Sequence, residues 1–128
     1  MAMSATETSP TLSIPAGSTA TTVVPSVLDN GGSKANHVAY VIISGTLTAG
    51  VVTLETSLDN VNWASVPAQG ASNVPSGAIF GSVATPAGFA TGTGNYVLSL
   101  QNSPAQYVRA AITTTITGGS VTAWVASA

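Results

Sequence analysis

Apolar and polar residues alternate with a period of two along most of the chain. Thr, Val and Ile are frequent in the alternating stretches, and Gly, Pro and Asn interrupt them at short intervals. This pattern is typical of strands with one buried face, and we find no convincing window with the period of an amphipathic helix. It predicts strands at residues 11–14, 19–27, 37–48, 51–57, 62–66, 78–83, 96–101, 106–117 and 120–127.

About eight or nine short strands without a helix favour an all-β fold, an antiparallel β-sandwich. A jelly-roll-like arrangement is one form of such a sandwich. A length of 128 residues suits one domain. We therefore expect a flexible N-terminal arm at residues 1–10 and a single sandwich domain at residues 11–128. The arm, MAMSATETSP, has neither the basic region nor the apolar run of a signal peptide.

Two segments of the chain are similar to each other. Residues 43–57 read ISGTLTAGVVTLETS and residues 112–126 read ITTTITGGSVTAWVA, with six of fifteen positions identical. Each segment reads as a hairpin around a two-residue loop, Ala49-Gly50 in the first and Gly118-Gly119 in the second. In both hairpins the apolar positions share one face, and a slip of one residue would turn them to the wrong side. The similarity reflects either a duplication or the shared requirements of two hairpins.

Charged residues are scarce, with four acidic and two basic side chains, or 5% of the chain. About 25% is usual in soluble domains. Two basic residues cannot neutralise a run of phosphates, so we expect no nucleic-acid partner. No stretch approaches the roughly 20 apolar residues that span a bilayer, so we expect no membrane partner. A nearly neutral surface rich in Thr and Ser favours association with other proteins.

Catalytic side chains are also few. His37 is the only histidine, no nucleophile motif of the form GxSxG is present, and the absence of cysteine excludes thiolate chemistry. A glycosidase would need two converging carboxylates, whereas Asp29 begins a turn sequence and Glu55 and Asp59 are separated by a strand end. We therefore expect that the protein is not an enzyme and has no cofactor.

The segment around Asp59 has two interpretations. Asp59, Asn60 and Asn62 offer oxygen ligands at the short spacing found in calcium loops. The same residue types form turns without an ion, through hydrogen bonds from side chain to backbone. The glycine and the final glutamate of a complete calcium loop are missing. We expect a structural turn made by Asp59, Asn60 and Trp63, and no metal site.

Three side chains are candidates for an interface. Glu55 and Arg109 occupy corresponding outward positions of long predicted strands, and they could pair across strands or across a subunit boundary. Trp124 lies on the face opposite Val121 and Val125, so it is either exposed or covered by a loop of its own chain. Exposed tryptophans are often anchors that a partner buries. Trp124, Arg109 and Glu55 are therefore the predicted interface residues.

Three motifs carry a resemblance to a known group of proteins. They are SLDNVNW at 57–63, YVRA at 107–110 and TITGGSVT at 115–122. In this order, over roughly residues 40–127, the chain resembles small β-structured virion proteins of tailed bacteriophages. Discoidin-like sugar-binding domains contain a similar element. Asn60 stands where the motif usually has glycine, and Asn tolerates a left-handed backbone, so the turn is expected to persist.

The resemblance implies a capsid decoration, or cement, protein. Such a protein would be made in the cytoplasm of the host bacterium and would bind the outer surface of the head. There it would stabilise the lattice of the major capsid protein, with a homotrimer as the favoured oligomer. One alternative is a structural protein of the tail, neck or head fibre. Another is a carbohydrate-binding β-sandwich module, which would expose Trp63 or Trp124 in a groove with polar neighbours.

Overall fold

The computed structural model describes residues 8–65 and 95–128. Within these ranges the regular secondary structure consists of strands, and every strand pair is antiparallel. The predicted all-β, antiparallel class is therefore confirmed. The strands are β1 (Thr11–Ser18), β2 (Leu28–Asp29), β3 (His37–Ser57), β4 (Ala64–Ser65), β5 (Asn95–Leu100) and β6 (Tyr107–Ser127). No helix in the described residues is long and apolar enough to cross a membrane.

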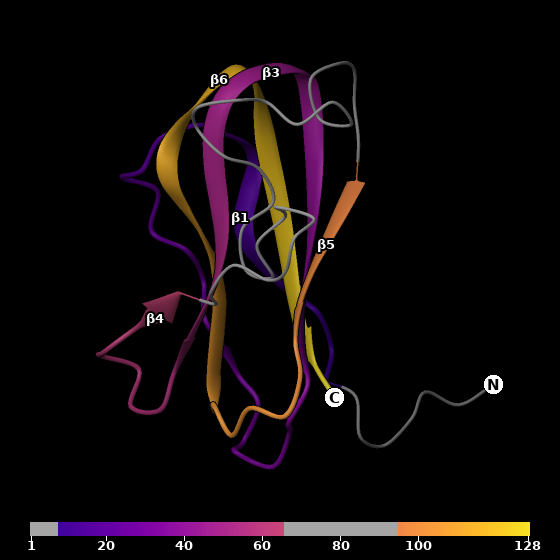
Figure 1. The fold of residues 1–128 in the computed structure, drawn as a ribbon, viewed down its shortest axis with the longest axis vertical. Coiled ribbons are helices and arrows are strands. Elements are labelled where there is room, and N and C mark those ends of the chain that lie inside the picture. Colours follow the sequence, from indigo (N-terminus) through magenta and orange to yellow (C-terminus); the bar gives the residue numbers. More distant parts are fainter. Residues whose placement is uncertain (1–7, 66–94) are drawn as a thin grey trace, which may run out of the picture.

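A long two-stranded ribbon organises the fold. β3 and β6 have 21 residues each and pair from His37 opposite Ser127 to Ser57 opposite Tyr107. The ribbon bends back on itself near its middle, at the top of Figure 1. The bend separates two halves of the ribbon. We call the half with residues 37–45 and 119–127 the first half, and the half with residues 51–57 and 107–114 the second half.

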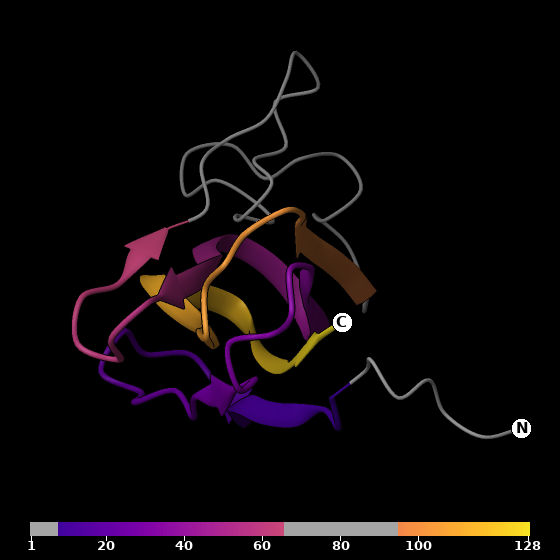
Figure 2. The same cartoon turned by 90° about the horizontal axis from the view of Figure 1, so that it is seen from below.

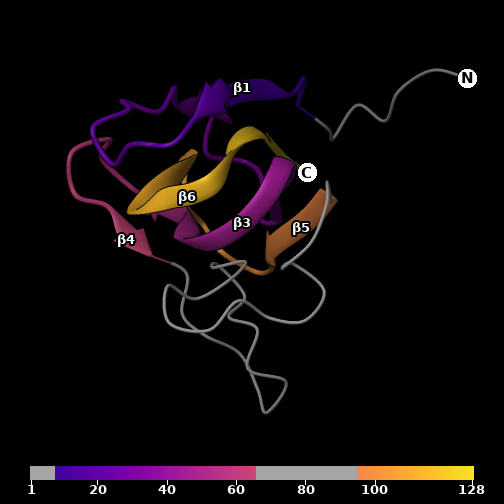
Figure 3. The same cartoon turned by 90° about the horizontal axis from the view of Figure 1, so that it is seen from above.

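Shorter strands extend each half of the ribbon. In the first half, β1 pairs with β6 and β5 pairs with β3, so the strand order is β1-β6-β3-β5. Figure 3 shows β1 and β5 on opposite sides of this half. In the second half, β2 pairs with β6 and β4 pairs with β3. β4 and β5 consequently lie on opposite sides of the molecule (Figure 2).

The predicted hairpins around Ala49-Gly50 and Gly118-Gly119 are wrong. The two similar segments pair with each other, with Ile43 opposite Val121 and Val52 opposite Ile112, and neither segment pairs with itself. Alternation of apolar residues determines which face of a strand is buried, but it does not determine the partner strand. A local hairpin and a pairing between distant segments bury the same side chains. The sequence similarity therefore belongs to two strands that pair across the same bend.

Irregular pairing at the bend changes which residues point inward. The register shifts between Gly45 and Val52, where β-bulges interrupt the ladder. Val41 and Ile43 are buried before these shifts, whereas Val52 and Leu54 are buried after them. The inward positions thus change from odd to even numbers in β3. An extra residue in one strand has this effect because successive side chains alternate between faces.

The bend also requires a close approach of two backbones. Gly118 has a φ of +91°, and a Cβ atom there would collide with the carbonyl oxygen of Thr46. A Cβ atom at Gly119 would collide with the carbonyl oxygen of Ser44. Glycine is therefore required here both for its conformation and for its lack of a side chain.

Other predicted strand limits also differ from the structure. No strand forms at residues 19–27, and β1 continues through Pro15 to Ser18. Proline is tolerated there because β1 pairs with only one described strand, β6, and edge positions can lack an N–H donor. Leu28 and Asp29, predicted as loop, form β2. The strand predicted at 78–83 lies outside the described residues. The sandwich arrangement with eight or nine strands stays a prediction.

One buried core joins the two halves. Its members come from both halves of the ribbon and from β1, β2 and β5, and each fully buried aliphatic side chain contributes about 1.5–3 kcal/mol. The core residues are Ile14, Leu28, Ala39, Val41, Ile43, Leu47, Val52, Leu54, Leu98, Val108, Ala110, Ile112, Ile116, Val121, Ala123 and Val125.

The N-terminal end of the described chain is attached to the ribbon. The backbone N–H of Thr8 donates to the carbonyl oxygen of Ser127, and the backbone N–H of Ser127 donates to Oγ1 of Thr8, each at 2.9 Å. Residue 8 of the predicted arm at 1–10 therefore contacts the domain. Residues 1–7 lie outside the described part of the chain.

Replacing Gly118 by alanine tests the close approach at the bend. We expect Gly118→Ala to lower the free energy of unfolding by about 2–5 kcal/mol, from left-handed backbone strain together with displacement of the Thr46 carbonyl. Gly31→Ala is the matched control, because Gly31 has a φ of +81° but open space around its Cβ position. The control should lose only about 1–2 kcal/mol. Equal losses in urea unfolding experiments would show that the bend does not depend on close packing.

Candidate functional site

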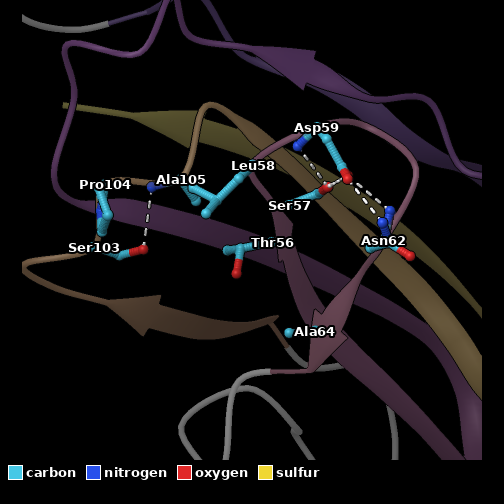
Figure 4. Close-up of a pocket in the computed structure, with 9 residues that line it drawn as sticks. All are labelled: Thr56, Ser57, Leu58, Asp59, Asn62, Ala64, Ser103, Pro104 and Ala105. Carbon is cyan, nitrogen blue, oxygen red and sulfur yellow. Dashed lines mark hydrogen bonds between the residues drawn. The ribbon is translucent and has the colours of Figure 1, made fainter.

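The segment Ser57–Trp63, which we call the 57–63 turn, is held by the carboxylate of Asp59. Oδ1 accepts the backbone N–H groups of Val61 at 2.9 Å and Asn62 at 2.8 Å, and it accepts the Ser57 hydroxyl at 3.0 Å. Oδ2 accepts the side-chain amide of Asn62 at 2.7 Å (Figure 4). These donors, with the Asn62 backbone N–H first, hold the pKa of Asp59 well below its usual range.

The remaining bonds of the turn are also local. Oγ of Ser57 accepts the backbone N–H groups of Asp59 at 3.2 Å and Asn60 at 2.9 Å. Asn60 has a φ of 62°, in the left-handed region that the usual glycine of the motif would occupy. Both oxygens of Asp59 are engaged by donors of the turn itself. The carboxylate of Asp59 therefore acts as the acceptor that shapes the turn.

The end of the turn is fastened to the ribbon through Arg109. Its guanidinium carbon lies 4.0 Å from the centre of the Trp63 ring, and its Nε donates to Oε1 of Glu55 at 2.7 Å. Glu55 and Arg109 are directly opposite each other on β3 and β6. Of the two pairings that the sequence left open, the structure shows the one across strands within a single chain. Trp63, Arg109 and Glu55 together brace the 57–63 turn.

Trp124 lies on the first half of the ribbon, away from this group. It is opposite Leu12 on β1 and opposite Tyr40 on β3, and Tyr40 is opposite Val97 on β5. These four side chains form a line across four strands, which we call the aromatic row. They are 37–56% exposed, and Trp124 itself is 39% exposed. The predicted interface residues therefore lie on two halves and do not form one cluster in the chain.

Sequence reasoning identified Trp124 but missed its neighbours in the row. Residues 38–43, VAYVII, are apolar at both odd and even positions, whereas a strand with one wet face should alternate. Apolar residues at both odd and even positions therefore indicated that the outer face of this strand is also apolar. Which residues lie next to Trp124 depends on how β1, β3, β5 and β6 pair and in what register. The sequence alone does not determine this pairing.

Two adjoining cavities border the aromatic row. The cavity next to Trp124 has about 450 Å³ and is lined by Pro10, Tyr40, Trp124, Val125 and Ala126. The other has about 530 Å³ and shares Pro10, Tyr40 and Ala126 with the first. Its remaining lining is Thr8, Asn36, His37, Val38, Ser99, Leu100, Gln101, Ser127 and Ala128. A third cavity of about 380 Å³ lies between the 57–63 turn and residues 103–105 (Figure 4).

His37 belongs to a buried polar network. Its Nε2 lies 3.1 Å from the carbonyl oxygen of Ser103, and its Nδ1 lies 2.8 Å from Oγ of Ser127, which also accepts the side-chain amide of Asn30 at 3.2 Å. A carbonyl can only accept, so Nε2 carries the proton and Nδ1 accepts the Ser127 hydroxyl. Burial lowers the pKa of His37. The neutral imidazole joins the ends of β3 and β6 to the segment after β5.

The lowered pKa of His37 predicts acid sensitivity near pH 6. Protonation is easier in the unfolded chain, with its ordinary pKa of 6.5, than in the folded protein. The stability that neutral His37 contributes is therefore complete above pH 6.5 and is lost as the pH falls through and below this value. We expect a lower urea midpoint at pH 5 than at pH 7.5. His37→Gln should reduce this difference, since the chain has no other histidine, and an unchanged difference would assign it to other groups.

The contact between Trp63 and Arg109 can be measured by a double-mutant cycle. We expect a coupling free energy of about 0.5–2 kcal/mol between Trp63→Leu and Arg109→Gln, because the guanidinium lies over the ring. The measurement is urea unfolding of the wild type, both single variants and the double variant. Strictly additive losses would mean that Trp63 and Arg109 stabilise the turn independently.

No protein-family model matches the chain, and no curated protein matches it. Two surface features bear on function, the braced 57–63 turn and the aromatic row with its cavities.

Proposed function

We propose that the protein is a capsid decoration protein of a tailed bacteriophage. It would bind the outer surface of the head as a homotrimer and stabilise the lattice of the major capsid protein. The observation that carries the proposal is the hydrogen-bonded 57–63 turn, which exposes two aliphatic side chains. Leu58 is 70% exposed and Val61 is 75% exposed. The turn projects from the ribbon beside β4 (Figure 1).

The construction of the turn suits a contact with another protein. Its backbone is fixed by Ser57 and Asp59, and its end is fixed by Trp63 against Arg109. A surface that is already ordered loses less conformational entropy when it binds. Leu58 and Val61 would then supply apolar area that a partner could bury. Many weak contacts of this kind, repeated over a symmetric lattice, produce strong overall binding.

Two of the three motifs of the resemblance meet in this turn. SLDNVNW supplies the turn and Trp63, and YVRA supplies Arg109, which contacts the Trp63 ring. The third motif, TITGGSVT, contains Gly118 and Gly119 at the bend. The shared residues thus maintain a framework and a projecting turn, which is consistent with a structural role in a virion.

The ionisable side chains also support a structural role. The carboxylates of Asp29, Glu55 and Asp59 each accept hydrogen bonds from their own chain. The side chain of Gln106, and then the N–H of Gly31, lower the pKa of Asp29. Groups engaged in this way stabilise local structure, whereas a general acid or base has to be free to reach a substrate.

Two other assignments remain as alternatives. A structural protein of the tail, neck or head fibre could use the same turn, and only its position in the virion distinguishes it from a decoration protein. A carbohydrate-binding module is favoured by a different observation: Trp124 is exposed beside an apolar cavity, and the adjoining cavity has polar residues in its lining.

Charged substitutions on the turn test the proposed contact. We expect Leu58→Asp and Val61→Asp to weaken binding to phage heads lacking the protein at least about tenfold, because burial of an unpaired carboxylate is costly. Val24→Asp is the matched control, since Val24 is an aliphatic side chain with 86% exposure outside the turn. Co-sedimentation with heads measures binding, and circular dichroism checks folding.

Two outcomes would contradict the proposal. Wild-type protein that stays monomeric and never binds heads would exclude the decoration role. Variants of Leu58 and Val61 that bind like the Val24 control would exclude the turn as the contact. Electron microscopy of the virion would locate the protein on the head or on the tail.

A further inference from the structure

The outer face of the first half carries three successive rows of side chains. Residues two apart on a strand share a face, so positions 36, 38 and 40 of the chain point the same way. The first row is the aromatic row, with Tyr40 opposite Trp124 and Val97. The second row is small, with Val38 opposite Ala126 and Ser99.

The third row is polar. Asn36 and Ala128 exchange backbone hydrogen bonds beyond the end of the β3–β6 ladder. The pairing of His37 with Leu100 places Asn36 next to Gln101 on the other side. Asn36 and Gln101 line the larger cavity together with Thr8. The second row, whose side chains are short, thus lies between the aromatic row and the polar row.

This arrangement explains the two cavities and defines one groove. Side chains of the second row are too short to fill the space between Tyr40 and the amides, so a hollow remains above them. Tyr40 and Asn36 are four positions apart, which corresponds to about 13 Å along a strand. The groove is therefore long enough for a short chain of rings in addition to a single ring.

We propose that this groove binds a neutral oligosaccharide. Its two aromatic side chains, Tyr40 and Trp124, are exposed and lie next to each other on adjacent strands. Aromatic rings offer flat apolar surfaces with a polar edge, against which the C–H face of a sugar ring can pack. Asn36, Ser99 and Gln101 then provide amide and hydroxyl groups for the sugar hydroxyls. A mainly apolar cavity with a few convergent polar groups is the usual form of a ligand site.

The lining also determines the charge of the ligand. Among the described residues, no charged side chain lines either cavity, and His37 is buried and bonded to Ser103 and Ser127. Acidic sugars and phosphates are generally held by arginine or lysine, which this groove lacks. Within the described part of the chain, the side chains of Ser99 and Gln101 make no hydrogen bonds. They are available to a neutral partner rich in hydroxyl groups.

A protein partner fits this face less well. The core of a protein interface is a continuous apolar area surrounded by a polar rim. Here the apolar side consists of the aromatic row with Ile42 beside it, and polar and small residues follow directly toward the end of the ribbon. The proposal is independent of capsid binding, because the 57–63 turn lies on the second half, and β4 and β5 are on opposite sides of the molecule (Figure 2).

The test begins with a glycan array that contains neutral, sialylated and sulfated oligosaccharides. The best neutral oligosaccharide is then titrated into the full chain, with Trp fluorescence and calorimetry as the measurements. We expect binding of neutral members only. Trp124→Ala and Tyr40→Ala should weaken it at least tenfold, and Gln101→Ala several-fold. Leu58→Asp, on the other half, is the control and should bind the oligosaccharide like the wild type.

Three results would overturn the proposal. The first is the absence of neutral-glycan binding on the array and at millimolar concentration in calorimetry. The second is a preference for acidic glycans, and the third is equal affinity of the Tyr40 and Trp124 variants and the wild type. If the Trp124 and Tyr40 variants instead lose self-association or head binding without any glycan binding, the face is a protein interface. Glycan binding by a protein that never binds heads would support the groove and reject the decoration role alone.

Discussion

The bend of the β3–β6 ribbon is the constraint on which the rest of the structure depends. Two strands of 21 residues can form a single core only if the ribbon turns back, and the backbones then approach so closely that Gly118 and Gly119 cannot carry side chains. The register shifts at the bend change the inward positions of β3 from odd to even numbers. As a result, the apolar faces of both halves contribute to one core, although the chain reaches it through pairings between distant segments.

Bending of the ribbon also separates the outer surfaces of the two halves. The second half holds the 57–63 turn, which is braced by Arg109, and the first half holds the aromatic row with its groove. Several of the few charged side chains bind to groups of their own chain: Glu55 pairs with Arg109, and Asp59 accepts hydrogen bonds within its turn. The exposed surfaces therefore present aliphatic, aromatic and neutral polar groups, and contacts through these groups depend on shape and hydrogen bonding more than on charge.

The sequence was sufficient for those features that depend on neighbouring residues. The alternation of apolar and polar residues predicted the all-β class, and the residues from Ser57 to Asn62 indicated a self-contained turn. Because side chains at odd and even positions of a strand point to opposite faces, the sequence also placed Trp124 on the face opposite the core. The pairing of β3 with β6 could not be obtained in this way, because a local hairpin satisfies the same alternation. For that reason Tyr40 was not recognised as the neighbour of Trp124.

The two candidate sites differ in the way the fold maintains them. Bonds between residues four or fewer positions apart hold most of the 57–63 turn, so its shape depends mainly on local interactions together with the contact to Arg109. The groove exists only while β1, β6, β3 and β5 keep their register, which brings Leu12, Trp124, Tyr40 and Val97 into line. A one-residue slip in any of these strands would turn one side of the groove toward the core. The groove is therefore coupled to the ribbon bend and its glycines, whereas the turn can vary in sequence with little effect on the rest of the fold.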